Sequence, residues 1–86
     1  MFDEITIKDV KVKIGLLCKS RRKELQLTRE QLADELNISR ATIQNIESGK
    51  NATLDNLLKI AVHFNLLDKI YHGLQQLESG DNISLY

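Results

Sequence analysis

The sequence of 86 residues contains no proline and only one cysteine. Without proline nothing forces a helix to break, and the chain lacks the turn punctuation that β-rich folds need. A single cysteine cannot form a disulfide within the chain, and it suggests a reducing, cytoplasmic setting. The composition and length therefore predict one small all-α domain.

Signals for export and for membrane insertion are also missing. The opening residues, MFDEITIKDV, lack a positively charged flank followed by an apolar run, so we expect no secretory signal. No stretch approaches the roughly 18 apolar residues of a membrane-spanning helix. The sequence thus predicts a cytoplasmic protein without a membrane partner.

The formal net charge is zero, but the charge is unevenly distributed. Residues 8–50 have a balance of +4, and the rest of the chain has a balance of −4. The basic residues of the first group are Lys8, Lys11, Lys13, Lys19, Arg21, Arg22, Lys23, Arg29, Arg40 and Lys50, against Asp9, Glu24, Glu30, Asp34, Glu35 and Glu47. A basic surface on a chain of zero net charge attracts the phosphate groups of nucleic acid, and we expect its non-specific binding to nucleic acid to be modest.

Residues 29–48 alternate apolar anchors and polar gaps at the spacing of a helix-turn-helix. The anchors expected between two crossing helices are Leu32, Leu36, Ile38, Ile43 and Ile46. Ala33 suits the closest approach of the two helices, and Asn37 suits a left-handed bend. The residues left to face outward from the second helix are Arg40, Ala41, Gln44 and Asn45. These types can read base edges, so the motif predicts double-stranded DNA as a partner.

The hydrophobic periodicity predicts five helices. The first covers residues 8–25, and the second covers residues 28–36 and begins with a capping box of Thr28 and Gln31. The third is capped by Ser39 and ends before Gly49. The fourth begins after Thr53, and the fifth covers residues 66–77. The fourth helix is expected to bury Leu54, Leu57, Leu58, Ala61 and Val62. We therefore expect an N-terminal extension (1–7), a DNA-binding domain (8–77) that ends in a dimerisation helix (66–77), and a tail (78–86).

With these elements placed, residues 14–65 resemble the phage Cro and repressor type of DNA-binding protein, the XRE family. The resemblance is carried by Leu27-Thr28, Gln31-Leu32-Ala33, Leu36, Ile38-Ser39, Ile43, Ile46-Glu47, Gly49-Lys50, Leu54, Leu57, Ile60 and Ala61. It implies a five-helix, lambda-repressor-like fold with the helix-turn-helix at helices 2 and 3. It also implies that helix 3 lies in the major groove of DNA, usually within a two-fold dimer.

The resemblance also assigns roles to individual positions. It implies base contacts from Arg40, Ala41, Gln44 and Asn45. It implies phosphate contacts from Thr28, Arg29, Ser39, Thr42, Ser48 and Lys50. It further implies a partly buried salt bridge between Arg22 and Glu47. Arg29 stands where the family commonly has glutamine, a departure that keeps phosphate binding but removes the brace that glutamine gives to a base-reading partner.

Simpler interpretations remain open for several of these residues. Arg40 could contact only phosphate, as arginine does more often than it contacts bases. Arg29, Gln44 and Asn45 could be solvated surface residues. Cys18 lies on the apolar stripe of the first helix and is expected to be a buried hydrophobe rather than a redox switch. His63 and His72 lack Cys, His or Asp partners at ligand spacing, so no metal site is expected. No Gly-rich phosphate loop or nucleophile motif appears, so no catalytic residue or cofactor is expected.

The fifth helix carries an apolar stripe formed by Leu67, Ile70, Leu74 and Leu77. This stripe could close the core over Val12 and Leu16 of the first helix. The chain has more apolar surface than a monomer needs to bury, however, and we expect the stripe to form a homodimer interface.

Two classes of function fit the sequence. The first is a sequence-specific transcription regulator, most simply a repressor acting as a homodimer on a pseudo-palindromic operator. The alternative is the antitoxin of a HipAB-type pair, which would bind a toxin protein as well as its own operator, because residues 49–70 are similar to HipB-type antitoxins. Control of a restriction–modification operon is also compatible with the size of the chain.

Overall fold

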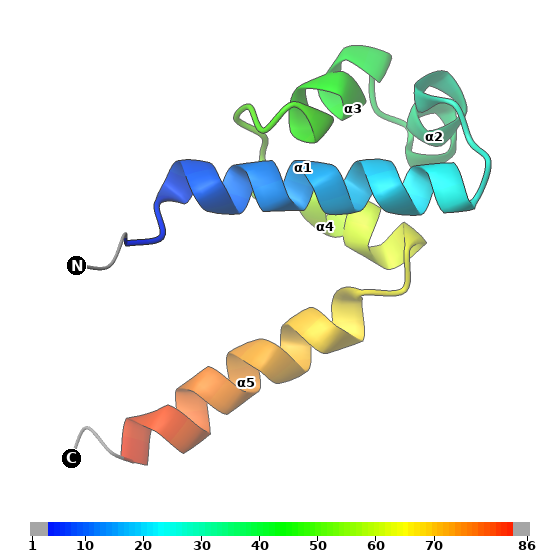
Figure 1. The fold of residues 1–86 in the computed structure, drawn as a ribbon. Helices are drawn as coiled ribbons and strands as arrows, with labels where there is room; N and C mark the ends of the chain where they lie inside the picture. The colour runs from blue at the N-terminus through cyan, green and yellow to red at the C-terminus, as the bar shows by residue number, and fades with distance from the viewer. Residues whose placement is uncertain (1–3, 84–86) are drawn as a thin grey trace.

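A computed structural model describes residues 4–83 as five helices without a strand (Figure 1). The helices are α1 (Ile7–Glu24), α2 (Arg29–Leu36), α3 (Arg40–Glu47), α4 (Leu54–His63) and α5 (Leu67–Ile83). This arrangement confirms the all-α class and the placement of the helix-turn-helix at α2 and α3. None of the described helices is long and apolar enough to cross a membrane.

Local capping chemistry determines where α2 begins and ends. The Thr28 side chain accepts a hydrogen bond from the backbone of Gln31 at 3.0 Å, and the Gln31 side chain accepts one from the backbone of Thr28 at 2.8 Å. Asn37 ends the helix in the left-handed conformation, with φ of 58°. Both features were predicted from the sequence, because they depend on neighbouring residues only.

The core lies where α1, α2, α3 and α4 meet. Leu32 and Ile43 are fully buried, and the surrounding buried residues are Cys18, Ala33, Ile46 and Ile60. Cys18 is 3 % exposed, as expected for a small hydrophobe on the buried stripe of α1. The anchors of the helix-turn-helix therefore form the centre of the molecule, and they fix the orientation of α3.

α1 and α3 approach one another closely at Gly15. A Cβ atom at this position would lie 2.5 Å from the carbonyl oxygen of Ile46 and 2.7 Å from that of Glu47. These are backbone atoms, so the neighbouring helix would have to move as a whole to make room. Gly15 thus allows α1 to support the end of α3, a role that the sequence analysis did not identify.

The buried face of α4 differs from the predicted face. Leu54 is 69 % exposed and Val62 is 57 % exposed, so the prediction that both are buried was wrong. Ala61 is buried as predicted, Ile60 is buried although it was not predicted to be, and Leu57 and Leu58 are half-buried. The helix is apolar over so much of its circumference that periodicity alone did not identify the face that meets α2.

The last helix is longer than predicted and leaves the core. α5 continues to Ile83, past the expected end at Leu77; residues 78–83 contain no proline, and Gly80 does not end the helix. Most of the predicted tail is therefore helical, and residues 84–86 lie outside the described part. Figure 1 shows α5 running away from α1, and Val12 and Leu16 remain 40 % and 54 % exposed. In this chain α5 does not close the core over them.

Candidate nucleic-acid interface

The outer face of α3 carries the four residues expected to contact bases. Arg40, Ala41, Gln44 and Asn45 are all exposed, while Ile43 and Ile46 of the same helix are buried. Arg40 Nη1 donates a hydrogen bond to Gln44 Oε1 at 3.2 Å. These two residues are four positions apart and lie on one side of the helix. Arg40 binds the amide oxygen of Gln44, so the amide NH₂ of Gln44 can donate to another partner.

The hydroxyl groups at the two ends of α3 hold the helix in place. Ser39 Oγ accepts a hydrogen bond from the Thr42 backbone at 3.0 Å and lies 2.8 Å from Thr42 Oγ1. Ser48 Oγ donates to the Gln44 carbonyl at 2.8 Å. These hydroxyls already have protein partners, although each oxygen can accept a further bond. Their first role is to fix the helix ends.

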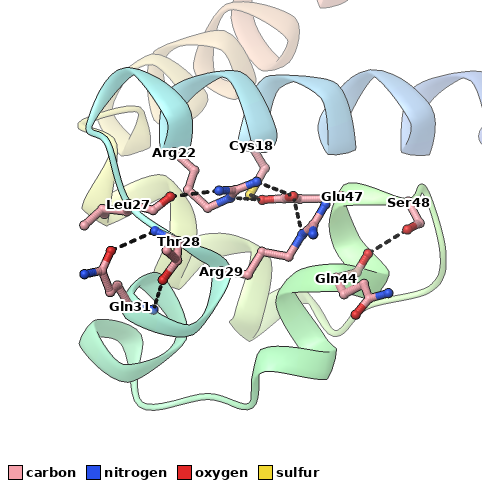
Figure 2. Close-up of polar contacts among 9 residues, drawn as sticks. All are labelled: Cys18, Arg22, Leu27, Thr28, Arg29, Gln31, Gln44, Glu47 and Ser48. Carbon is pink, nitrogen blue, oxygen red and sulfur yellow. Dashed lines mark hydrogen bonds and ion pairs between the residues drawn. The ribbon is translucent and has the colours of Figure 1, made fainter.

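Glu47 joins three elements through two arginines (Figure 2). Arg22 of α1 donates from Nε to Glu47 Oε2 at 2.7 Å and from Nη2 to Oε1 at 3.1 Å. Arg22 Nη1 donates to the Leu27 carbonyl at 2.8 Å. Arg29 of α2 donates from Nε to Glu47 Oε1 at 2.9 Å. The ion pair expected between Arg22 and Glu47 is thus present, and Arg29 joins it.

The surroundings of Glu47 determine how it and its neighbours ionise. Burial raises the pKa of the Glu47 carboxyl, but the hydrogen bonds from Arg22 and Arg29 outweigh burial and leave the pKa below its usual range. Burial, reinforced by the Glu47 carboxylate, raises the pKa of the Cys18 thiol to about 12. Glu47 therefore remains an anion at neutral pH, and Cys18 remains a protonated thiol.

The link between Arg29 and Glu47 was not predicted, and it changes the interpretation of Arg29. The two side chains come from positions 18 residues apart, and the sequence offers Arg29 nearer acidic neighbours in its own helix. The Arg29 side chain is 32 % exposed, while that of Glu47 is 2 % exposed. Glu47 thus binds the Nε side of the Arg29 guanidinium group. This ion pair fixes the position from which the rest of the Arg29 side chain reaches solvent.

Lys50 follows α3 in the segment that connects it to α4. Gly49 adopts a left-handed conformation with φ of 77° and lies against Val12 of α1. Lys11 of α1 donates a hydrogen bond to the side chain of Asn51. Lys50 is exposed between these two contacts, so α1 fixes both sides of the loop that carries it.

A further polar contact links two of the helices α1–α4. His63 at the end of α4 lies 3.2 Å from Glu35 of α2 through Nε2. Within residues 4–83, no group of three His, Cys, Asp or Glu residues is arranged to hold a metal ion. The exposed basic and amide side chains of α2, α3 and the following loop are consequently the main chemical feature of this side of the molecule.

Comparison with known proteins agrees with this geometry. No curated protein matches the chain. The family model described as Helix-turn-helix (HTH_3) matches residues 19–68, which is more than half of the chain and spans α2, α3 and α4 completely. The match includes Arg22, Arg29 and Glu47 as well as the exposed face of α3. The chain belongs to the XRE-type helix-turn-helix family of DNA-binding regulators.

Proposed function

We propose that this protein is a repressor that binds a pseudo-palindromic operator as a homodimer in the cytoplasm, where its DNA target lies. The observation that carries the proposal is the exposed face of α3 beside Arg29, whose position is fixed by Glu47. Two recognition helices related by a two-fold axis would enter successive major grooves, with half-sites about one helical turn apart.

Different side chains would contact the bases and the phosphates of DNA. We assign base contacts to Arg40, Ala41, Gln44 and Asn45, because they form the exposed face of α3. We assign phosphate contacts to Thr28, Arg29, Ser39, Thr42, Ser48 and Lys50, which lie at helix ends and in the loop after α3. Phosphate contacts fix the register of the protein on DNA, and base contacts supply the sequence preference.

Homodimerisation rests on the apolar stripe of α5. Leu67, Ile70, Leu74 and Leu77 are 39–61 % exposed in the single chain. A stripe of this length on a helix that projects from the body is unfavourable in water unless another surface covers it. Dimerisation would cover the stripe and would link two DNA-reading helices.

Selection of bound DNA from a random pool at a stated salt concentration tests the proposal. We expect the selected sites to contain an inverted repeat. Gln44→Ala should cost roughly 1–3 kcal/mol on the selected site and relax the preference at one base pair. Arg29→Ala should weaken binding to all sequences alike and reduce the salt slope by about one.

Arg29→Lys is the matched control, because it keeps the charge but lacks the Nε–H that binds Glu47. Circular dichroism should show that each variant is folded before its affinity is measured. An unchanged sequence preference for Gln44→Ala would contradict its role in reading a base. Tight binding to a single half-site would contradict the proposed dimer on DNA.

A second candidate is an antitoxin that binds a toxin protein as well as its operator. It is favoured by two exposed apolar residues that α5 does not cover, Ile5 just before α1 at 81 % and Ile7 at its start at 76 %. Co-expression with the product of the neighbouring gene, followed by purification at a fixed stoichiometry, would distinguish an antitoxin from a simple repressor.

A further inference from the structure

An open apolar groove lies between α1, α4 and α5. Its volume is about 550 Å³. Ile14 and Leu17 line it from α1, Leu54 and Leu57 from α4, and Ile70 from α5. Lys69 is the one charged residue among the described residues that line it. The groove therefore continues the core outward to an exposed surface.

The lining of this groove indicates what kind of molecule it accepts. A site for a small molecule usually combines apolar walls with a few convergent polar groups that orient the ligand. Here the walls are apolar apart from Lys69 and are formed mostly by leucine and isoleucine side chains. A row of apolar side chains on a helix fits such walls better, because a helix satisfies its own backbone groups and needs only apolar contacts.

The chain itself carries such a row. Tyr71, Leu74 and Leu77 lie on α5 beyond the groove, and each is 59–61 % exposed. Adding a methyl group at Gly73 would meet nothing within 4 Å, so this part of α5 stands clear of the rest of its own chain. One molecule thus holds an unfilled apolar groove and, separately, an uncovered apolar helix.

Charge complementarity favours a second copy as the occupant. The charged residues of α1 that reach the surface are Lys8, Lys11, Lys13, Lys19, Arg21 and Lys23, against Asp9 and Glu24. The charge of Arg22 is buried and bound by Glu47. The side chains of α5 include Asp68 and Glu78 against Lys69. The groove therefore has a basic helix as one wall, and the helix available to fill it is slightly acidic.

From these features we infer that α5 of each protomer docks in the groove between α1 and α4 of its partner. This inference rests on the proposed homodimer and specifies its interface. A single two-fold operation fills both grooves and covers both helices, so the contact is closed and reciprocal. It differs from a seam in which the two α5 helices pair only with each other.

The two arrangements can be separated by mixing two variants. Leu17→Lys alters the groove, and Leu74→Glu alters the docking helix. In the exchanged dimer, each substitution alone places charges in both interfaces and should raise the dimer Kd by roughly 100-fold or more. In a mixed dimer, one interface is entirely wild type, and the other pairs Lys with Glu. Mixing should therefore restore dimers that contain one copy of each variant.

Leu54→Lys provides a second groove variant in case Leu17→Lys perturbs folding, since Leu54 is 69 % exposed. Gln76→Glu is the matched control, because it adds the same charge to an exposed position of α5 away from the stripe. Oligomeric state is measured by light scattering and sedimentation, and folding is checked by circular dichroism. The control should remain dimeric at the concentration at which Leu74→Glu is monomeric.

Two results would overturn the inference, and they can be told apart. If the folded groove variants remain dimeric and only Leu74→Glu is monomeric, the α5 helices pair with each other, and the homodimer still stands. If the wild-type protein is monomeric at all concentrations, both the inference and the proposed homodimer fail. The groove would then be open to a different protein.

Discussion

In the body formed by α1–α4, each helix buries one face against another. α5 instead projects from the body (Figure 1), and its residues Leu67, Ile70, Tyr71, Leu74 and Leu77 are exposed. The buried charge of the body, Glu47, is bound by Arg22 and Arg29. Asp68, Lys69, Tyr71, His72 and Glu78 of α5 are exposed. From this contrast we propose that α3, the helix expected to contact DNA, is positioned within one chain, while α5 would gain its packing from a partner. Substitutions of the same type in the two regions should therefore have very different effects.

The largest difference is expected between Glu47→Ala in the body and Glu78→Ala in α5. Loss of Glu47 leaves Arg22 buried without its counter-ion and next to Arg29, so the free energy of unfolding should fall by roughly 3–5 kcal/mol. Glu78 is exposed and should change it by less than about 0.5 kcal/mol. Denaturant unfolding at pH 7 and one fixed protein concentration measures both, and similar midpoints for the two variants would refute the contrast.

Gly15 of α1 and Gly73 of α5 should respond to substitution by alanine with opposite signs. Gly15→Ala forces a Cβ against the backbone of α3 and should destabilise the protein by about 1–3 kcal/mol. Gly73→Ala meets no neighbour and should stabilise α5 by about 0.5–1 kcal/mol through its helix propensity. Thermal unfolding under identical conditions compares them. Equal shifts in Tm would mean that α1 and α3 can separate without cost.

A smaller effect is expected from acidification. The pKa of the Glu47 carboxyl is lower in the folded state than in the unfolded state. The Glu47 charge therefore stabilises the fold fully at pH values above its unfolded-state pKa, and this stabilisation is lost as the pH falls through its folded-state pKa. The stability of wild type should therefore approach that of Glu47→Gln as the pH falls below about 4.3, the ordinary glutamate value. Urea unfolding from pH 7 to pH 3 follows this convergence. A constant difference between the two proteins would show that the Glu47 charge does not contribute.

The parts of the structure that could be predicted from the sequence are those that depend on short spacings. The capping box of Thr28 and Gln31 and the left-handed Asn37 involve residues at most three positions apart, and both were predicted. The contact of Arg29 with Glu47 spans 18 residues and has no local signature. The close approach at Gly15 likewise depends on how two helices cross, which periodicity does not specify.

Predicting the surface was harder for a related reason. Periodicity identified the apolar stripe of α5 but not whether its own chain or another one covers it. It also assigned Val62 to the core, although the face of α4 that meets α2 is centred on Ile60 and Ala61. The exposed face of α3 could be predicted because its apolar residues are few and regularly spaced, which leaves a single possible outer face. Its contacts with DNA remain a prediction.

Amide hydrogen exchange at several protein concentrations tests most directly whether the body is complete in one chain while α5 depends on a partner. We expect the amides of Ile43 and Ile46 to exchange at the same slow rate at every concentration at which the protein is folded. The amides from Tyr71 to Leu77 should exchange rapidly at concentrations well below the dimer Kd and become protected as the concentration rises through it. Protection of α5 that is the same at all concentrations, in a protein shown to be monomeric, would contradict the account.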